Sequence, residues 1–321
     1  MKALVLEGEK QPLKYREFEA PVPGDGKLVV QIKATGLNHR DVYVTQGLYP
    51  GIRFPIILGS DGAGELEGRA VIINPSMNWG DNPGFQQKSF KILGLPDHGT
   101  FAERVLVPAS KIHDKPAHLS FEQAAALPLA GVTAYRALFT KCQLKKGGKV
   151  LISGIGGGVA LTALLFALAA GAEVYVTSGS QDKIDRAIEM GAKGGANYKS
   201  AEWPETLKEQ AGGFDVIVDS AGGAGFSNFL KVVNPGCRIA VYGGSLGKIQ
   251  NLSPQIIFWK QVSILGTTMG TDEDFKAMLD FVNRHKIIPV VDSVFDLQDG
   301  IAAFERMDNG LQFGKIVLRV S

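Results

Sequence analysis

Residues 36–43, GLNHRDVY, bring an amide, an imidazole, a guanidinium, a carboxylate and a phenol close together in the sequence. Such a set could bind a metal ion, relay protons or simply form a solvated loop. A phenol can protonate an oxygen anion within hydrogen-bonding distance, so Tyr43 is a candidate proton donor and Tyr49 is its alternative. Either ring could instead wall an apolar pocket while water supplies the proton.

A second candidate site is the glycine-rich turn at residues 154–158. In KVLISGIGGGVALTALLFALAAGAEVYVTS the order strand, turn, helix, strand is that of a dinucleotide-binding unit. Gly154 permits a tight turn, Gly157 lets the backbone approach a pyrophosphate, and Ala160 lets the helix lie close to the sheet. The turn is one residue longer than the common fingerprint, and a tight connection without a ligand is the alternative interpretation. The residues expected to line the phosphates are Gly154, Gly156, Gly157, Gly158 and Val159.

The residues after the second strand of this unit bear on which dinucleotide is bound. An NAD-specific protein places a carboxylate there, on the ribose 2′-hydroxyl. This chain has TSGSQDK instead, with Ser178 at the aligned position, followed by Ser180 and Lys183. Hydroxyls and an amine suit a 2′-phosphate, which a carboxylate would repel. We therefore predict NADP(H) as the cofactor, although Lys183 could be no more than a solvated lysine at a helix start.

Two kinds of pattern divide the chain into two predicted domains. Short β-like runs interrupted by Pro and Gly predict a small β structure at residues 1–119. Apolar strands alternating with helices, including one expected within GFSNFLKVVNPG, predict a doubly wound parallel sheet at residues 120–267. Mixed patterning returns in residues 268–321, which we expect to rejoin the first domain. Gly243, Gly244 and Ser245 follow the strand CRIAVYG, where such a sheet presents its ligand-binding edge, with a plain turn as the alternative.

Charge and composition exclude several classes of partner. The formal charge of +2 is spread along the chain without a block of like charges, so we expect no nucleic-acid or membrane partner. The longest apolar run, residues 159–170, is shorter than the roughly 20 residues that cross a bilayer. Two cysteines, Cys142 and Cys237, are too few for a disulfide framework or a thiolate metal site, and they fit a cytoplasmic protein.

Several motifs in the same order give the chain a family resemblance over nearly its whole length. They are GLNHRDVYVTQGLYP, FPIILGSDGAG, GTFAERVLVP, AALPLAGVTAYRAL, the glycine turn, EMGAKGGANY, DVIVDSAGG and FGKIVL. With these motifs the chain resembles the medium-chain dehydrogenase/reductase superfamily, and within it the zinc-independent quinone oxidoreductases and enone reductases. The resemblance implies an α/β fold in which a Rossmann-type doubly wound parallel sheet is joined to a β-rich, GroES-like catalytic domain.

The resemblance also bears on the metal. Zinc alcohol dehydrogenases of this superfamily have a Cys, a His followed by Glu, and a second Cys where this chain has Asn38, Ser60 with Asp61, and Leu129. An amide, a hydroxyl, one carboxylate and a leucine do not provide the three strong donors that catalytic zinc requires. We therefore expect no catalytic zinc, and hydride transfer to an acceptor that is already electrophilic.

Further roles are implied by the resemblance alone. Asn38 would lie beside the nicotinamide ribose, Thr133 would approach the nicotinamide, Tyr198 would reach the adenine-ribose phosphate, and the backbone from Thr267 onward would hold the carboxamide. Each has a structural alternative, such as a loop-fixing amide or a helix hydroxyl bonded to its own backbone. Arg40 could orient a carbonyl, although an ion pair with Asp41 or Asp61 is the preferred interpretation, and Lys315 could reach a phosphate or be an exposed strand lysine.

These expectations combine into one predicted activity. The chain is predicted to be an NADPH-dependent oxidoreductase that reduces a small-molecule quinone or conjugated carbonyl between its two domains. The alternatives are a reductase of enoyl thioesters and a non-catalytic NADPH sensor. The resemblance implies a homodimer joined edge to edge through the strand VSILGTTMG.

Overall fold

The computed structural model describes residues 1–321, which form two compact units. The first unit comprises Met1–Val132 with Gly270–Ser321, and the second comprises Thr133–Met269. Residues 120–132 belong to the first unit because α2 (Phe121–Ala125) packs against strands of that unit. None of the helices is both long and apolar enough to cross a membrane.

The first unit is mainly β structure. Its largest sheet has the strand order β10-β6-β5-β3-β18-β17, and β9 also pairs with β3. A smaller sheet has the order β2-β1-β4, and β7 pairs with β8. The strands are β1 (Lys2–Leu6), β2 (Leu13–Glu17), β3 (Lys27–Gly36), β4 (Ile56–Ile57), β5 (Asp61–Leu66), β6 (Arg69–Ile73), β7 (Ser76–Met77), β8 (Lys91–Ile92), β9 (Arg104–Pro108), β10 (Ile112–Asp114), β17 (Val291–Asp296) and β18 (Lys315–Arg319).

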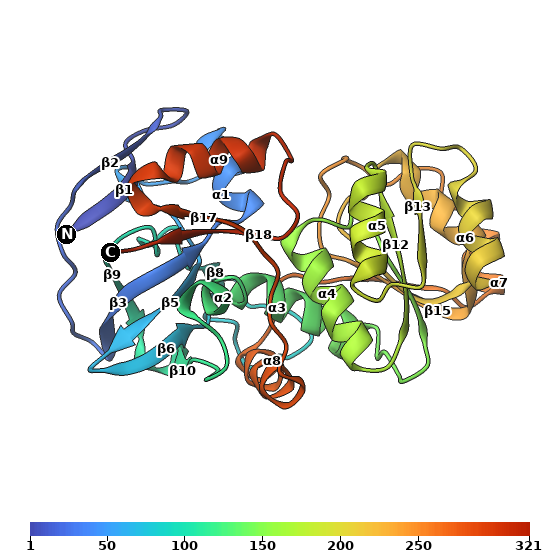
Figure 1. The fold of residues 1–321 in the computed structure, drawn as a ribbon, viewed down its shortest axis with the longest axis horizontal. Helices are drawn as coiled ribbons and strands as arrows, with labels where there is room; N and C mark the ends of the chain where they lie inside the picture. The colour runs from blue at the N-terminus through green and yellow to red at the C-terminus, as the bar shows by residue number, and fades with distance from the viewer. The chain divides into compact units, whose positions relative to one another are not determined.

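The tail of the chain rejoins the first unit, as its patterning predicts. Strand β18 pairs antiparallel with β3, so the red C-terminal strand lies beside a blue N-terminal one in Figure 1. This unit contains the helices α1 (His39–Thr45), α2, α8 (Asp272–His285) and α9 (Gly300–Asp308), and the start of α3 (Pro128–Tyr135). It also contains the 3₁₀ turns η1 (Ala109–Lys111) and η4 (Leu297–Asp299).

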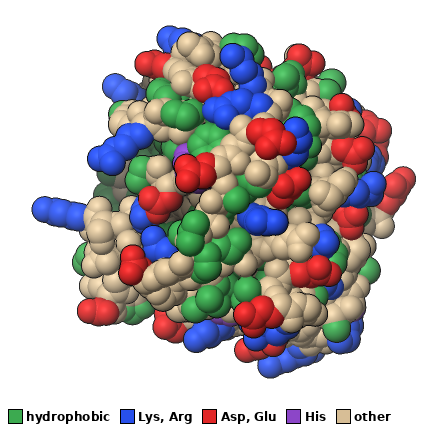
Figure 2. Space-filling view, turned by 90° about the vertical axis from the view of Figure 1, so that its left-hand side faces the viewer, with side chains coloured by type: hydrophobic (Ala, Val, Ile, Leu, Met, Phe, Trp, Pro, Cys, Tyr) green, Lys and Arg blue, Asp and Glu red, His purple; other side chains and the backbone are tan.

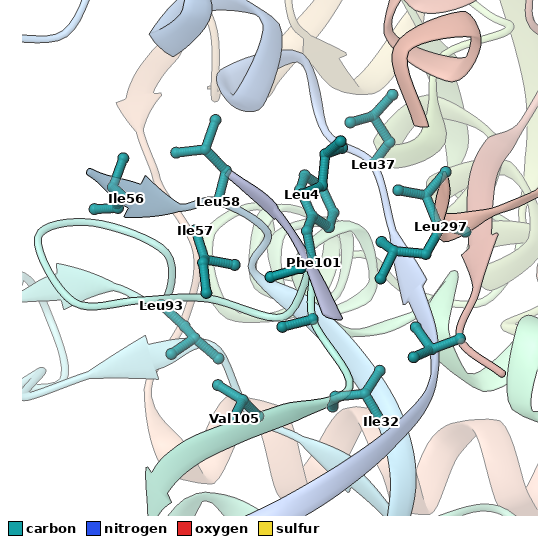
Figure 3. Close-up of a cluster of buried hydrophobic side chains, with 14 of the residues drawn as sticks. Leu4, Ile32, Leu37, Ile56, Ile57, Leu58, Leu93, Phe101, Val105 and Leu297 are labelled. Atoms are coloured by element: carbon teal, nitrogen blue, oxygen red, sulfur yellow. The ribbon is translucent and has the colours of Figure 1, made fainter. Parts of the chain in front are cut away.

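The core of the first unit fixes the loops that carry its polar residues. Leu4, Ile32, Leu37, Leu58 and Phe101 belong to the buried cluster drawn in Figure 3, and all are at most 1% exposed. Burying side chains of this size stabilises the fold by about 1.5–3 kcal/mol each. Because Leu37 and Leu58 are anchored in this core, the polar residues that follow them in the chain have fixed positions.

The second unit is a parallel sheet with the order β13-β12-β11-β14-β15-β16. Its central strands are apolar and buried on both faces, as the sequence predicts; Val150, Leu151 and Ile152 are 0% exposed. In Figure 1, α4 and α5 lie on one side of the sheet and α6 on the other. The elements are β11 (Lys149–Ile152), α4 (Gly158–Ala169), β12 (Glu173–Ser178), α5 (Gln181–Glu189), β13 (Gly194–Asn197), α6 (Trp203–Ala211), β14 (Phe214–Asp219), η3 (Ala224–Lys231), β15 (Val233–Val241), α7 (Pro254–Trp259) and β16 (Ser263–Gly266), after a π-helical segment, η2 (Arg136–Lys141).

Two elements of the second unit differ from expectation. The segment predicted as a helix within GFSNFLKVVNPG is a 3₁₀ helix, η3, and Phe226 and Phe229 anchor it in the core. Strand β13 has the sequence GGAN, which lacks the β-branched and aromatic residues that mark a strand, so the pattern does not reveal it. It forms because its backbone completes the edge of the sheet beside β12.

Candidate active site

Helix α1 carries most of GLNHRDVY. Asn38 is its N-cap, and the Asn38 backbone N–H donates to Asp41 Oδ2 at 2.9 Å. The Asp41 side chain is fully buried, and this burial raises its pKa to about 6, although the nearby Arg40 charge opposes the shift. The carboxylate therefore fixes the start of the helix, which sets where the neighbouring side chains point.

A buried cation–carboxylate–amide cluster lies where β3, β5 and β18 meet. Lys315 Nζ donates to Asp61 Oδ2 at 2.8 Å and to Asn38 Oδ1 at 2.6 Å, and Asn38 Nδ2 donates to the same Asp61 oxygen at 3.0 Å. Lys315 and Asp61 are 4% and 0% exposed. The expectation that Lys315 reaches a phosphate or is exposed is wrong, because its ammonium is buried against a carboxylate. The lysine could not be placed from its sequence position, because its partners lie more than 250 residues earlier.

The donor set at this cluster does not fit a catalytic zinc. The second Asp61 oxygen, Oδ1, accepts from the Leu129 backbone N–H at 2.7 Å, so both carboxylate oxygens already have partners. An ammonium 2.8 Å from the carboxylate would repel a metal ion brought to the same group. No group of three or more His, Cys, Asp or Glu side chains in the structure could hold a metal. No step through a metal follows from these residues.

Arg40 does not form the predicted ion pair with Asp41 or Asp61. Its Nη1 donates instead to Ser60 Oγ at 2.7 Å and to the Leu93 carbonyl at 3.1 Å. Asp61 is unavailable because Lys315 holds it, and Asp41 Oδ2 accepts from the backbone of Asn38. The guanidinium therefore links the segments that carry Ser60 and Leu93, and both of its acceptors are uncharged.

The two candidate proton donors lie in different surroundings. Tyr43, on α1, is half-buried, and its ring centroid is 6.3 Å from that of the exposed His39. Tyr49 is 38% exposed, and its ring centroid is 5.8 Å from Arg40 Cζ. Tyr49 therefore lies beside the Arg40 guanidinium, whereas Tyr43 lies on α1 near His39.

In the second unit, the glycine turn has the geometry of a phosphate cradle. Gly154 and Gly156 have φ values of 65° and 121°, which are accessible to glycine but strained for other residues. Gly157 is the N-cap of α4 and provides no side-chain cap, so the N–H groups of Gly158 and Val159 remain available at the positive end of the helix. Ala160 is 1% exposed, so the helix approaches the sheet closely, as expected.

Basic and hydroxyl side chains surround the end of β12. Ser178 Oγ accepts from the Ser180 backbone N–H at 3.2 Å. A Cβ atom placed on Gly156 would lie 2.8 Å from Lys183 Cδ, so this lysine lies against the glycine turn rather than in open solvent. On Gly179, a Cβ atom would lie 2.7 Å from the Tyr198 hydroxyl and 3.0 Å from Lys199 Cε.

Lys199 also lies at this corner, although its sequence position does not mark it. Its only signal is its place directly after Tyr198 in ANYKS. It reaches this corner because β13, the unpredicted strand, lies parallel to β12 and ends beside Ser178.

The remaining predicted residues lie at or near the carboxyl ends of the sheet strands or at the start of this unit. A Cβ atom on Gly243 would lie 2.4 Å from the Ser220 carbonyl, so only glycine fits between the ends of β14 and β15; Gly244 and Ser245 follow it and are exposed. The hydroxyls of Thr133, in α3, and Thr267, after β16, are buried and have no hydrogen-bond partner. Buried hydroxyls are rarely left unpaired in a finished site. Together with the glycine turn, these two hydroxyls fit a bound nicotinamide dinucleotide.

Comparison with known proteins agrees with this architecture. Residues 24–117 match the model of the alcohol dehydrogenase GroES-like domain, and residues 158–284 match that of the zinc-binding dehydrogenase family. A zinc-type alcohol dehydrogenase-like protein, YogA, from Leptosphaeria maculans is 35% identical, over 96% of this chain and 95% of its own length.

Two solved structures have the same fold over essentially the whole chain. A crystal structure of an NAD-dependent alcohol dehydrogenase superposes with a TM-score of 0.93 at 35% identity, covering 100% of both chains. The quinone oxidoreductase of Thermus thermophilus, also solved in complex with NADPH, has a TM-score of 0.84 at 28% identity, covering 99% of this chain and 100% of its own. The chain described here is therefore an oxidoreductase and belongs to the medium-chain dehydrogenase/reductase superfamily.

Proposed function

We propose that the chain is a zinc-independent, NADPH-dependent oxidoreductase that delivers hydride to a quinone or to a conjugated carbonyl such as an enone or alkenal. The observation that carries this proposal is the bond of 2.8 Å between Lys315 Nζ and Asp61. An ammonium there neutralises Asp61, the carboxylate that stands beside the position of a zinc ligand in the relatives. Without a metal to polarise a simple alcohol or aldehyde, the suitable acceptors are those that are electrophilic by themselves.

The preference for NADPH rests on the corner at the end of β12. Ser178, Ser180, Lys183, Tyr198 and Lys199 provide hydroxyls and two positive charges, and none of them is a carboxylate. A 2′-phosphate is recognised by such a set. The complex of the Thermus thermophilus quinone oxidoreductase with NADPH supports this choice. The relative described as an NAD-dependent alcohol dehydrogenase shows that the fold alone does not decide it.

The residues of the proposed site would hold the two ends of the cofactor. The bound cofactor supplies the hydride, and the chain holds and orients it. The glycine turn and the start of α4 would hold the pyrophosphate, while Thr133 and the backbone after Thr267 would hold the nicotinamide end. Both ends of the Asn38 side chain are already engaged within the cluster, so we assign this residue to positioning the loop, and its direct contact with the cofactor stays a prediction.

A panel of acceptors tests the proposed function. Purified protein is mixed with NADPH or NADH and with a quinone, an alkenal, a CoA-linked enone or a plain aldehyde, and loss of nicotinamide absorbance is followed. We expect NADPH oxidation with the quinone or the alkenal. Turnover of the CoA-linked enone alone would identify an enoyl-thioester reductase, and tight NADPH binding without any oxidation would identify a sensor.

We propose that Tyr43 donates the proton to the reduced acceptor. Tyr49, whose ring lies beside Arg40, is not assigned that role. A well-placed general acid contributes about 10²–10⁴ to the rate, so Tyr43→Phe is expected to lower kcat by about 100-fold. The matched variant Tyr49→Phe retains the ring that faces Arg40 and should change kcat by less than about threefold. Steady-state kinetics on the accepted substrate measures both, and an unchanged kcat for Tyr43→Phe would assign the proton to water.

A homodimer in the cytoplasm completes the proposal. Strand β16 pairs only with β15, so its other edge is open, and Phe258 and Trp259, shortly before it in the chain, are 59% and 83% exposed. An apolar, unpaired edge of this kind is normally covered by another chain. Light scattering coupled to size exclusion is expected to give twice the mass of 34.3 kDa, and the mass of one chain would refute the dimer.

A further inference from the structure

Arg40 is a half-buried cation with no carboxylate within salt-bridge distance, although it interacts electrostatically with the neighbouring Asp41. Its two hydrogen bonds to the protein both use Nη1, and the acceptors are a hydroxyl and a carbonyl, which carry no charge. Asp61 is bonded to Lys315, and Asp41 forms no salt bridge with Arg40. The positive charge is therefore held in place but is not neutralised by an ion pair.

One edge of the guanidinium is unused. Arg40 Nε is buried and has no hydrogen-bond partner, and Nη2 forms no hydrogen bond with the protein. An unpaired buried donor costs about 1–3 kcal/mol, so its presence needs a reason. Nε is enclosed by the protein, whereas Nη2 is not, so Nη2 is the group that can meet an anionic oxygen of a ligand.

The surroundings of Arg40 hold its guanidinium in place. Ser60 is fully buried, and it lies two residues after Leu58, a member of the buried cluster drawn in Figure 3. The Leu93 carbonyl fixes the same Nη1 from another loop, and the Tyr49 ring lies 5.8 Å from Cζ. A donor that is held in place before the reaction stabilises developing charge without a cost of reorganisation.

We propose that Arg40 binds the oxygen of the acceptor on which negative charge develops, and so provides the electrophilic stabilisation that a metal ion gives in zinc-dependent relatives. This inference rests on the proposed function. The acceptor gains a hydride at its β-carbon, which forms a new C–H bond and leaves the nicotinamide oxidised. The electron pair of the C=C bond moves to form a double bond to the carbonyl carbon, and the C=O pair moves onto the oxygen. Arg40 offsets that charge until a proton arrives.

A binding experiment without turnover tests this role. 4-Nitrophenol is used as the probe because its phenolate resembles the anionic product of hydride transfer and absorbs at a different wavelength from the phenol. An adjacent positive charge lowers an acid's pKa by about 1–3 units, so the wild-type protein, with NADP⁺ bound, should lower the apparent pKa of the bound probe by at least about one unit. Arg40→Met should abolish that shift and weaken phenolate binding by about 10–100-fold.

Matched variants separate a lost charge from a damaged fold. Arg53→Met removes an exposed arginine from the same unit and should bind the probe as the wild type does. Arg40→Lys keeps the charge and should retain part of the pKa shift. In Arg40→Ala, kcat/KM should fall by about 100-fold, the size expected for loss of one preorganised donor, and low concentrations of guanidinium should restore activity.

The outcomes distinguish this inference from the proposed function. If the wild type reduces quinones or enones and Arg40→Met retains its kcat/KM and the probe shift, the role of Arg40 is refuted while the function stands. If no acceptor oxidises NADPH, the proposed function fails, and with it the catalytic role given to Arg40. If guanidinium fails to restore Arg40→Ala while Arg40→Lys behaves as Arg40→Met does, the arginine is structural and the inference is overturned.

Discussion

Replacing Lys315 with methionine is expected to lower the free energy of unfolding by about 3–5 kcal/mol, because it leaves Asp61 as a buried carboxylate without its cation. The same substitution removes the donor to Asn38 Oδ1 and to the Leu37 carbonyl. Methionine has a similar length and is apolar, so the effect reports the lost charge rather than a large cavity. Urea titration followed by circular dichroism measures the change.

Two further variants show whether the cluster is the cause. Lys2→Met removes a lysine whose partner Glu17 is exposed, and such surface pairs contribute only about 0–1 kcal/mol. Adding Asp61→Asn to Lys315→Met removes the unpaired charge and should recover at least about half of the loss. A Lys315→Met protein as stable as the wild type would mean that the carboxylate is not buried with a paired charge.

Replacing both Lys183 and Lys199 with methionine is expected to raise the dissociation constant for NADPH by about 100-fold or more and to leave that for NADH within about threefold. The two amines lie beside Gly156 and Gly179 at the corner proposed for the 2′-phosphate. Each hydrogen bond to a charged group contributes about 1.5–3 kcal/mol, and only NADPH carries the group that would be lost. Fluorescence titration of the reduced nicotinamide measures both constants without an acceptor.

Lys193 provides the matched control for this pair. It is an exposed lysine that precedes β13, on the same edge of the sheet, so Lys193→Met removes a similar charge from outside the corner. We expect it to leave both dissociation constants unchanged. Equal weakening of NADPH and NADH by the double variant would show that the lysines act on the shared part of the cofactor and would remove the basis for NADP(H) specificity.

The sequence predicts the features whose causes are local. Gly154 and Gly157 stand between an apolar strand and an apolar helix, and the structure gives them the tight turn and the open helix start that this pattern implies. Val150 to Ile152 are apolar at every position, which is why a strand buried on both faces could be predicted. The C-terminal strand pairs with the distant β3, and its return could be predicted only because the pattern of the tail changes from that of the alternating strands and helices.

The features that escape prediction depend on contacts between distant segments. Lys315 pairs with a carboxylate on another strand, and no local pattern distinguishes a buried lysine from an exposed one. The sequence offers Arg40 two possible acidic partners, Asp61 and Asp41. In the structure Lys315 is bonded to Asp61, and Asp41 accepts from the backbone at the start of α1. Lys199 comes to the corner proposed for the 2′-phosphate because a glycine-rich strand, weak in β propensity, pairs with β12.

One face of the molecule carries both signs of charge. The face shown in Figure 2 carries lysines, arginines and acidic residues intermixed, without an extended patch of one sign. Nucleic-acid binding normally requires a clustered basic surface. This face therefore gives no support to a polyanionic partner.

The most direct test of the account is the rate of NADPH oxidation with its best quinone or alkenal acceptor before and after exhaustive dialysis against a strong chelator. A zinc-independent site should give the same rate in both samples, less than about 0.1 zinc per chain by elemental analysis, and no oxidation of plain alcohols on adding zinc. Activity that disappears with the chelator and returns with stoichiometric zinc would contradict it, because the Lys315–Asp61 pair would then have to give way to a metal ion.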